Sequence, residues 1–243
     1  MSTSSNPLAS EDERQVLASV LADRVSSYRM FSRLFLKPLA EEDIQALVDM
    51  DLVERAKELE GSELLAEGFN DMGRGLRRRH TGTRQQLGTD FTMCFDGVQS
   101  VEEKVAVPYA SVFLSEKALL NQEPRLEVYM TFQAERIHLK QGIDLPEDHL
   151  SFELEFLALL SNSAQAALEK DNPAEAVRNL KVSAEFIRVH ILSWYDLLTE
   201  RANQIIKTRF YRGVLKATKG YLELDLETIN DLVEALEDEQ SQQ

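Results

Sequence analysis

Apolar side chains recur every three to four residues along almost the whole of this 243-residue chain. That spacing places them on one face of an α-helix, whereas a half-buried strand requires alternation at every second residue. One segment, residues 105–113, is rich in strand-forming residues, but Pro108 interrupts it and no second strand is apparent to pair with it. The pattern predicts an all-α protein, a single helical bundle of about nine to eleven helices.

Local signals predict where several of these helices begin and end. Ser10, followed three residues later by Glu13, has the form of a capping box, so the first long helix begins there, and Pro38 ends it. Apolar spacing predicts another helix from about residue 124 to residue 140. Asp225 is predicted to cap a short last helix, because aspartate is favoured at that position.

The helical pattern breaks near the middle of the chain, over residues 142–149, where Pro146 lies. We predict an N-terminal helical subdomain (residues 1–140), a hinge (141–149) and a C-terminal helical subdomain (150–243) whose acidic tail frays. A chain of this length can bury one large core or two smaller ones. The expected architecture is therefore one bundle made of two subdomains joined by the hinge.

The chain is strongly acidic, with 27 lysine and arginine residues against 42 aspartate and glutamate residues and a formal net charge of −15. Such a negative field repels a phosphate backbone, and it attracts cationic peptides and raises their encounter rate. The composition therefore argues against nucleic acid as a partner and favours a basic peptide.

The single cysteine, Cys94, cannot form an intrachain disulfide, which fits a reducing compartment and predicts a cytoplasmic location. No charged side chain precedes Glu11, so the basic region that opens a secretory signal is absent. No apolar run approaches the roughly 18 residues that a membrane span needs. We expect neither export by a signal of its own nor stable insertion into a membrane.

The sequence contains no strong signature of catalysis or of a bound cofactor. The four histidines are too dispersed for a zincin motif, and no glycine-rich nucleotide loop is present. Glu135 and His138 have the Glu-x-x-His spacing of a dinuclear metal site, but the second copy that such a site needs is absent. An ordinary polar helix face explains this pair better. We expect no cofactor, no metal and no enzymatic activity.

A short arginine-rich patch interrupts the overall acidity. It consists of Arg74, Arg77, Arg78, Arg79, His80 and Arg84. The patch either binds an acidic partner or a phosphate group, or it is a solvated helix end whose arginines complement the helix dipole. The sequence favours the second explanation.

A second polar cluster lies at the end of the predicted hinge. Glu147, Asp148 and His149 stand at a loop-to-helix junction, and Glu153 and Glu155 follow on the helix. In one interpretation Asp148 caps the helix and Glu153 interacts favourably with the helix dipole. In the other, the junction is an acidic docking point that holds a guanidinium group through two parallel hydrogen bonds. Spacing alone favours the first interpretation.

Three segments resemble motifs of one protein family. Residues 90–95 (Asp-Phe-Thr-Met-Cys-Phe) resemble its Asp-Tyr-x-x-Leu-Phe element, and residues 108–113 (Pro-Tyr-Ala-Ser-Val-Phe) resemble its Pro-Tyr-x-Ser-Val-Tyr loop. Residues 146–157 are similar to its Glu-Pro-x-Asp-His hinge and the Glu-Leu-x-Phe helix that follows, although Leu145 stands where the family often has glutamate. With order and spacing in agreement, the chain resembles the TorD/DmsD (NarJ-like) family of cytoplasmic molybdoenzyme maturation chaperones.

The resemblance implies a chaperone that binds the twin-arginine signal peptide, or the apo-form, of a molybdenum-cofactor oxidoreductase and assists cofactor insertion before export. Exposed ion pairs contribute only about 0 to 1 kcal/mol each, so an apolar groove that holds the leader as a helix should supply most of the affinity. The acidic side of the implied site, which reads the basic end of the leader, comprises Glu147, Asp148 and His149, with Glu153 beside them. The side that shapes or supports the groove comprises Phe91, Phe95, Pro108, Tyr109, Ser111 and Phe113.

Two alternatives stay open at this point. One is a helical scaffold or regulatory protein that binds a folded partner through the arginine-rich patch. The other is an enzyme that uses Asp148 and His149 as acid and base. A further hypothesis is that His149 changes its charge near neutral pH and thereby modulates the grip on a client. The sequence is compatible with a monomer or a dimer.

Overall fold

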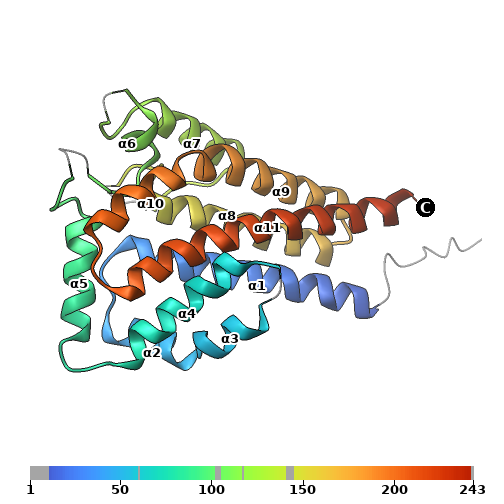
Figure 1. Cartoon of the computed structure of the whole chain (residues 1–243). Helices are drawn as coiled ribbons and strands as arrows, with labels where there is room; N and C mark the ends of the chain where they lie inside the picture. Colours follow the sequence, from blue (N-terminus) through green and yellow to red (C-terminus); the bar gives the residue numbers. More distant parts are fainter. Residues whose placement is uncertain (1–10, 60, 102–104, 117, 141–144, 242–243) are drawn as a thin grey trace, which may run out of the picture.

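The computed structural model describes residues 11–59, 61–101, 105–116, 118–140 and 145–241 (Figure 1). Within these ranges the chain forms eleven α-helices and one π-helical segment, and no β-strand. The helices are α1 (Glu11–Leu36), α2 (Glu41–Asp49), α3 (Leu52–Glu58), α4 (Glu63–Arg77), α5 (Thr83–Cys94), α6 (Ala110–Leu114), α7 (Glu123–Ala134), α8 (Leu150–Glu169), α9 (Pro173–Phe186), the π segment η1 (Ile187–Leu192), α10 (Ser193–Ile205) and α11 (Arg209–Ser241). The prediction of an all-α protein is confirmed.

Long helices from both ends of the chain build the centre of the bundle. α1 packs along α8, α4 packs along α11, and α9 contacts both α8 and α11 (Figure 1). Their buried side chains join into one continuous apolar core. Because α1 and α4 precede the predicted hinge while α8 and α11 follow it, this core draws on both predicted subdomains. The division into two subdomains stays a prediction, and residues 141–144 of the hinge lie outside the described residues.

The close approach of α4 and α11 depends on glycines at their contact. A Cβ atom added at Gly68 would lie 2.3 Å from the backbone nitrogen of Ala217, and one added at Gly220 would lie 2.4 Å from that of Leu65. Side chains at these positions would therefore overlap the backbone of the facing helix, which overpacks the interface.

The prediction that Asp225 caps a short last helix is wrong. α11 runs without a break through this position, and it continues to Ser241 where the sequence predicted a fraying tail. The Asp225 carboxylate is buried and accepts hydrogen bonds from the Arg24 guanidinium at 2.7 and 3.0 Å, and another from the Tyr28 hydroxyl. Its partners thus lie on α1, about two hundred residues earlier in the chain, and local sequence carries no sign of them.

The other predicted helix ends agree only in part with the structure. α1 ends at Leu36, shortly before Pro38, and begins at Glu11, although Ser10 of the predicted capping box lies outside the described residues. α7 ends at Ala134 and not near residue 140, because the chain turns at Arg136, which adopts a left-handed conformation with φ of 57°. Among the helices described here, none offers a sufficiently long apolar stretch to span a bilayer.

Candidate functional site

The loop before α6 and the end of the predicted hinge lie side by side. Tyr109 and His149 form an isolated antiparallel bridge, in which the backbone N–H of Ala110 donates to the carbonyl of Asp148 at 3.1 Å and that of Leu150 donates to the carbonyl of Pro108 at 2.9 Å. Two of the motifs that carry the family resemblance therefore meet in space. We call this contact the α6–α8 junction and define it by residues 108–111 and 147–150.

Asp148 is fully buried at the α6–α8 junction, with 0% of its surface exposed. Its Oδ2 accepts a hydrogen bond from the backbone N–H of Ser111, in the first turn of α6, at 2.8 Å, while its Oδ1 has no partner within the described part of the chain. Burial raises the pKa of this carboxyl, and the hydrogen bonds from Ser111 oppose the rise. Asp148 thus ties the loop to the hinge, and the prediction that it caps α8 is wrong.

His149 is the residue that caps α8. Its Nδ1 accepts a hydrogen bond from the backbone N–H of Ser151 at 3.1 Å, and its ring packs edge-on against Tyr109 with 4.7 Å between ring centroids. Only 5% of the residue is exposed, and burial lowers its pKa to about 4. The imidazole is therefore neutral at physiological pH, so the hypothesis that it titrates near neutrality in this conformation is wrong.

Glu153 lies one turn into α8 and is also fully buried. Neither of its carboxylate oxygens has a hydrogen-bond partner among the residues that the structure describes. Burial raises the pKa of Glu153 well above its ordinary value, and the neighbouring charge of Asp148 raises it further. A buried carboxyl without partners keeps its proton, because an uncompensated charge is far more costly to bury.

Glu147 differs from its neighbours because it reaches the surface. Its side chain is 15% exposed, and its Oε2 accepts a hydrogen bond from Nε of Arg125 on α7 at 2.6 Å. Arg125 is 40% exposed. Of the four residues predicted for the acidic side of the site, Glu147 is thus the one that solvent and a ligand can reach. Its carboxylate already pairs with the guanidinium of Arg125 from the same chain.

The four aromatic residues predicted to shape a groove are buried in the core. Phe91 and Phe95 pack on each other and on Tyr211, with ring centroids 5.4 to 6.2 Å apart. Phe113 stacks on Trp194 at 5.3 Å, beneath the Arg201 guanidinium. These side chains support the walls of the bundle in this conformation, and their contact with a client stays a prediction.

The remaining two predicted site residues hold the loop in place. Pro108 is buried and gives its carbonyl to the bridge with α8. Ser111 is buried, and its Oγ accepts a hydrogen bond from the backbone N–H of Gln122, just before α7. Together they connect the α6–α8 junction to the start of α7.

Sequence reasoning did not single out Arg125 or the outer face of α7 as functional. Leu126, Tyr129 and Met130 fall within the helix predicted from about residue 124, and all three are exposed. The sequence does carry a signal of this arrangement. On a helix, Leu126, Tyr129 and Met130 lie on the side opposite to Val128 and Phe132, which are buried.

The arginine-rich patch lies at the end of α4 and the start of α5. Arg74, Arg77, Arg78, Arg79 and Arg84 are all exposed. None of the five makes an ion pair with a carboxylate in the described ranges at bonding distance. Their charges are therefore available to a partner, and both explanations from the sequence stay predictions.

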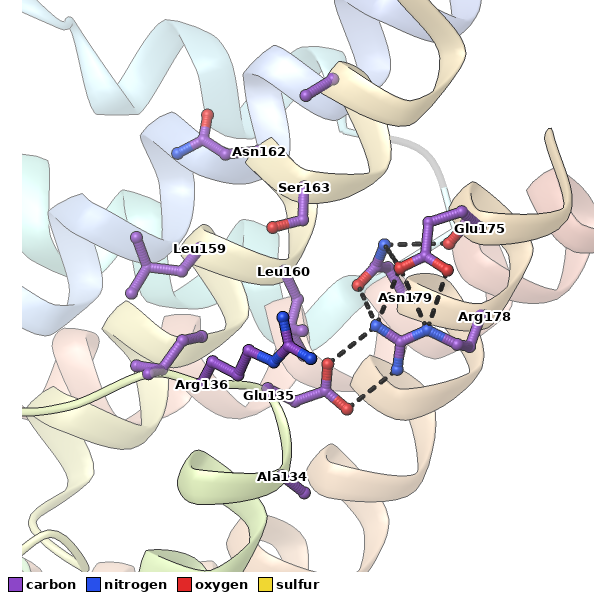
Figure 2. Close-up of a pocket in the computed structure, with 12 residues that line it drawn as sticks. Ala134, Glu135, Arg136, Leu159, Leu160, Asn162, Ser163, Glu175, Arg178 and Asn179 are labelled. Carbon is purple, nitrogen blue, oxygen red and sulfur yellow. Dashed lines mark hydrogen bonds and ion pairs between the residues drawn. The ribbon is translucent and has the colours of Figure 1, made fainter. Parts of the chain in front are cut away.

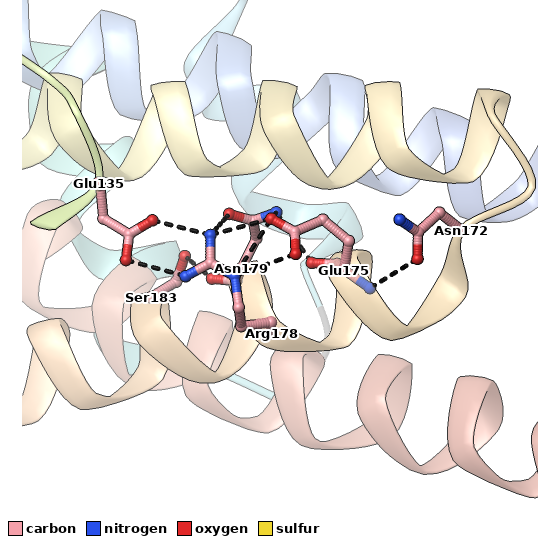
Figure 3. A network of polar contacts seen from close by, with 6 residues as sticks. All are labelled: Glu135, Asn172, Glu175, Arg178, Asn179 and Ser183. Carbon is pink, nitrogen blue, oxygen red and sulfur yellow. Dashed lines mark hydrogen bonds and ion pairs between the residues drawn. The ribbon is translucent and has the colours of Figure 1, made fainter.

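A separate cavity of about 750 Å³ lies between the end of α7, α8 and α9 (Figure 2). Arg178 on α9 dominates its wall, because its two terminal nitrogens each donate to one oxygen of Glu135 at 2.9 Å and it also donates to Glu175 and Asn179 (Figure 3). His138 interacts with Gln133 and does not share a partner with Glu135. The Glu-x-x-His pair thus divides between two local contacts, and within the cavity the charges of Glu135, Glu175 and Arg178 are already paired with one another.

Comparison with known proteins identifies relatives across most of the chain. The model of the family described as "Nitrate reductase delta subunit" matches residues 59–200. A protein named "Chaperone protein TorD" from Vibrio cholerae serotype O1 (strain ATCC 39541) is 26% identical over 211 residues, which cover 87% of this chain and 94% of that protein. Proteins of the same name from Vibrio vulnificus (strain YJ016) and Vibrio atlanticus are 27% and 25% identical, over 83% of this chain and 92% of theirs. The chain belongs to the nitrate reductase delta subunit family, the NarJ- and TorD-like group that its motifs resemble.

Proposed function

We propose that this chain is a cytoplasmic chaperone for a molybdenum-cofactor oxidoreductase. It binds the twin-arginine leader of the apoprotein, or the apoprotein itself, and holds it until the cofactor is inserted and export can proceed. The observation that carries this proposal is the similarity to proteins named TorD chaperones over more than four fifths of the chain. The net charge of −15 supports it, because an acidic surface attracts a cationic leader.

The α6–α8 junction supports the binding step in a different way from the one that the sequence suggested. Asp148 and His149 are buried and bonded to backbone amides, so they set the positions of the α6 loop and of α8. Glu147 stands beside them at the surface and is the carboxylate within reach of a client arginine. We propose that Glu147 exchanges Arg125 for this arginine, since a guanidinium from either source makes the same hydrogen bonds.

Calorimetric titration of the purified chain with a synthetic leader peptide tests the proposal. The peptide carries an arginine pair followed by an apolar helix-forming segment, and a second peptide has glutamines in place of the arginines. We expect the first to bind more tightly, and Glu147→Gln to raise its Kd by about two- to fivefold, as an exposed ion pair allows. Glu155→Gln is the matched control, because Glu155 is an exposed carboxylate paired with Arg29. Binding that ignores both the arginines and polar substitutions in the apolar segment would contradict the proposal.

A second candidate function is a scaffold or regulatory protein that docks a folded acidic partner. The five exposed arginines of the patch at residues 74–84 favour it, because they have no ion-pair partner within the described residues. Reversal of charge at Arg77 and Arg79 distinguishes the two functions. The charge reversal is expected to abolish the binding of an acidic partner by a scaffold. Binding of the leader peptide is expected to persist, because it depends on Glu147. The burial of Asp148 and His149 argues against the acid–base enzyme, because substrate cannot reach either group in this conformation.

A further inference from the structure

Exposed apolar side chains concentrate in one segment of the chain. Of the thirteen large hydrophobic residues that the structure describes as exposed, seven lie between residues 114 and 145. They are Leu114, Leu119, Leu120, Leu126, Tyr129, Met130 and Leu145. Single exposed apolar residues are common on protein surfaces, whereas exposed apolar residues that form a contiguous patch mark an interaction site.

Helix α7 carries the centre of this cluster. Its inner face packs into the bundle through Val128 and through Phe132, which stacks on Phe156 of α8 at 4.6 Å between ring centroids. Its outer face presents Leu126, Tyr129 and Met130, which share one side because they are three and four residues apart. Leu126 is 56% exposed and Met130 is 63% exposed. A helix that is apolar on both sides is normally covered on both, and no described part of the chain covers the outer side of α7.

The loop that leads into α7 extends the same surface. Leu119 and Leu120 project from it, 57% and 41% exposed. The residues that flank this pair, Ala118 and Asn121, adopt left-handed backbone conformations with φ of 48° and 59°. Such conformations cost energy for residues other than glycine, and strain of this kind concentrates at ligand-binding segments.

A small cavity joins the end of the loop to the helix face. Its volume is about 240 Å³, and it is lined by Asn121, Gln122, Arg125, Leu126 and Tyr129. Small-molecule sites are usually larger, at about 300 to 1,000 Å³, so this cavity suits one side chain of a bound peptide. One of its walls, Arg125, is the residue that holds Glu147.

The charge around this surface is negative. Glu123 and Glu127 are exposed on α7, each three residues before an exposed apolar side chain of the outer face, Leu126 or Met130. Glu116 is exposed in the loop. In the described part of the chain none of these three carboxylates forms an ion pair. An apolar strip beside free carboxylates complements a peptide that carries cations next to an apolar helix.

We propose that the surface formed by Leu119, Leu120, Leu126, Tyr129 and Met130, here called the α7 surface, receives the apolar segment of the client leader as a helix. The basic end of the leader then lies against Glu123, Glu127 and Glu147. This proposal rests on the proposed function and locates the apolar half of its binding site. The sequence assigned that half to Phe91, Phe95, Tyr109 and Phe113, which are buried in the core.

The test compares two double variants of the full chain in calorimetric titrations with the arginine-pair peptide. Leu126→Ser with Met130→Ser removes the centre of the α7 surface, and both positions are exposed, so the fold is retained. Val16→Ser with Leu36→Ser is the matched control, because it removes two exposed apolar side chains of α1. The first variant is expected to raise Kd on the order of tenfold, since two large side chains lose their burial against the peptide. The control is expected to leave Kd unchanged.

A second measurement locates the peptide directly. A photo-reactive benzophenone residue at the centre of its apolar segment is crosslinked to the protein, and the attachment sites are mapped by mass spectrometry. Attachment within residues 118–134 supports the proposal. Attachment confined to α5 or to the loop before α6 overturns it.

Three other results overturn the proposal, and they differ in what else they affect. Arginine-dependent binding that the Leu126→Ser/Met130→Ser variant leaves intact removes the α7 surface from the site but leaves the proposed function in place. A change in molar mass from dimer to monomer in this variant, with peptide binding unchanged, identifies the surface as a contact between copies of the chain. Failure of the unmodified chain to bind the peptide removes the proposed function as well.

Discussion

Replacement of Glu153 by glutamine should make the protein more stable, by an amount that grows with pH. In the folded chain Glu153 is buried and has no described hydrogen-bond partner, and burial raises its pKa well above the ordinary 4.5. The unfolded chain releases this proton above pH 4.5, whereas the folded chain retains it. The free energy of unfolding therefore falls as pH rises, by about 1.4 kcal/mol for each pH unit over which the folded carboxyl stays protonated. Glutamine has nearly the same shape and does not titrate, so it removes this loss.

Urea denaturation at pH 5, 6 and 7 and constant ionic strength measures the effect. The difference in unfolding free energy between Glu153→Gln and the unmodified chain should increase by about 3 kcal/mol from pH 5 to pH 7 if the proton is retained throughout. Glu155→Gln, which removes a carboxylate that is 40% exposed on the same helix, is the matched control. A difference that is constant or shrinks as pH rises would refute the reasoning. It would mean that the Glu153 carboxylate is ionised in the fold and held by a cation or donor.

Three further predictions follow from other contacts. Gly220→Ala should lower the unfolding free energy by about 2 kcal/mol or more and Tm by about 4–8 °C in calorimetry, because its Cβ would lie 2.4 Å from the backbone of Leu65; an unchanged Tm would contradict the close packing of α4 and α11. Arg125→Gln should lower the Kd of the arginine-pair peptide by about two- to fivefold in calorimetric titration, because it frees Glu147, and should leave the glutamine peptide unaffected; weaker binding would instead make Arg125 a support for Glu147. Burial lowers the pKa of His149 to about 4, so its contribution to stability is present above about pH 6.5 and is lost as pH falls toward 4. In urea denaturation His149→Asn should remove this loss of stability, and a pH dependence that the variant leaves unaltered would contradict the prediction.

Much of the fold could be predicted because helices are encoded locally. The spacing of apolar residues identified the α-helical class and the first long helix, α1, and Pro38 marked its end. The errors fall where a distant contact decides. Asp225 has the chemistry of a cap but pairs with Arg24 on α1, so α11 continues through it.

The sequence could predict which residues belong to the candidate site, but not how they are exposed. The motif resemblance named the residues of the α6–α8 junction, and the structure brings Tyr109 and His149 together. The motif resemblance did not show which of these residues are exposed. Asp148 and His149 each satisfy a backbone amide and are buried, while Glu147, one residue earlier, reaches the surface and pairs with Arg125.

By itself, the sequence determined the helical class, the acidic charge and the motifs of the family, because periodicity, composition and short motifs are properties of neighbouring residues. Tertiary structure alone decided which apolar faces are covered. Phe91 and Met130 both follow the helical period, yet Phe95 and Tyr211 of α11 pack against the first and nothing described covers the second. The physical reason is that burial depends on which other helix packs against a face, and this is set by contacts between segments far apart in the chain.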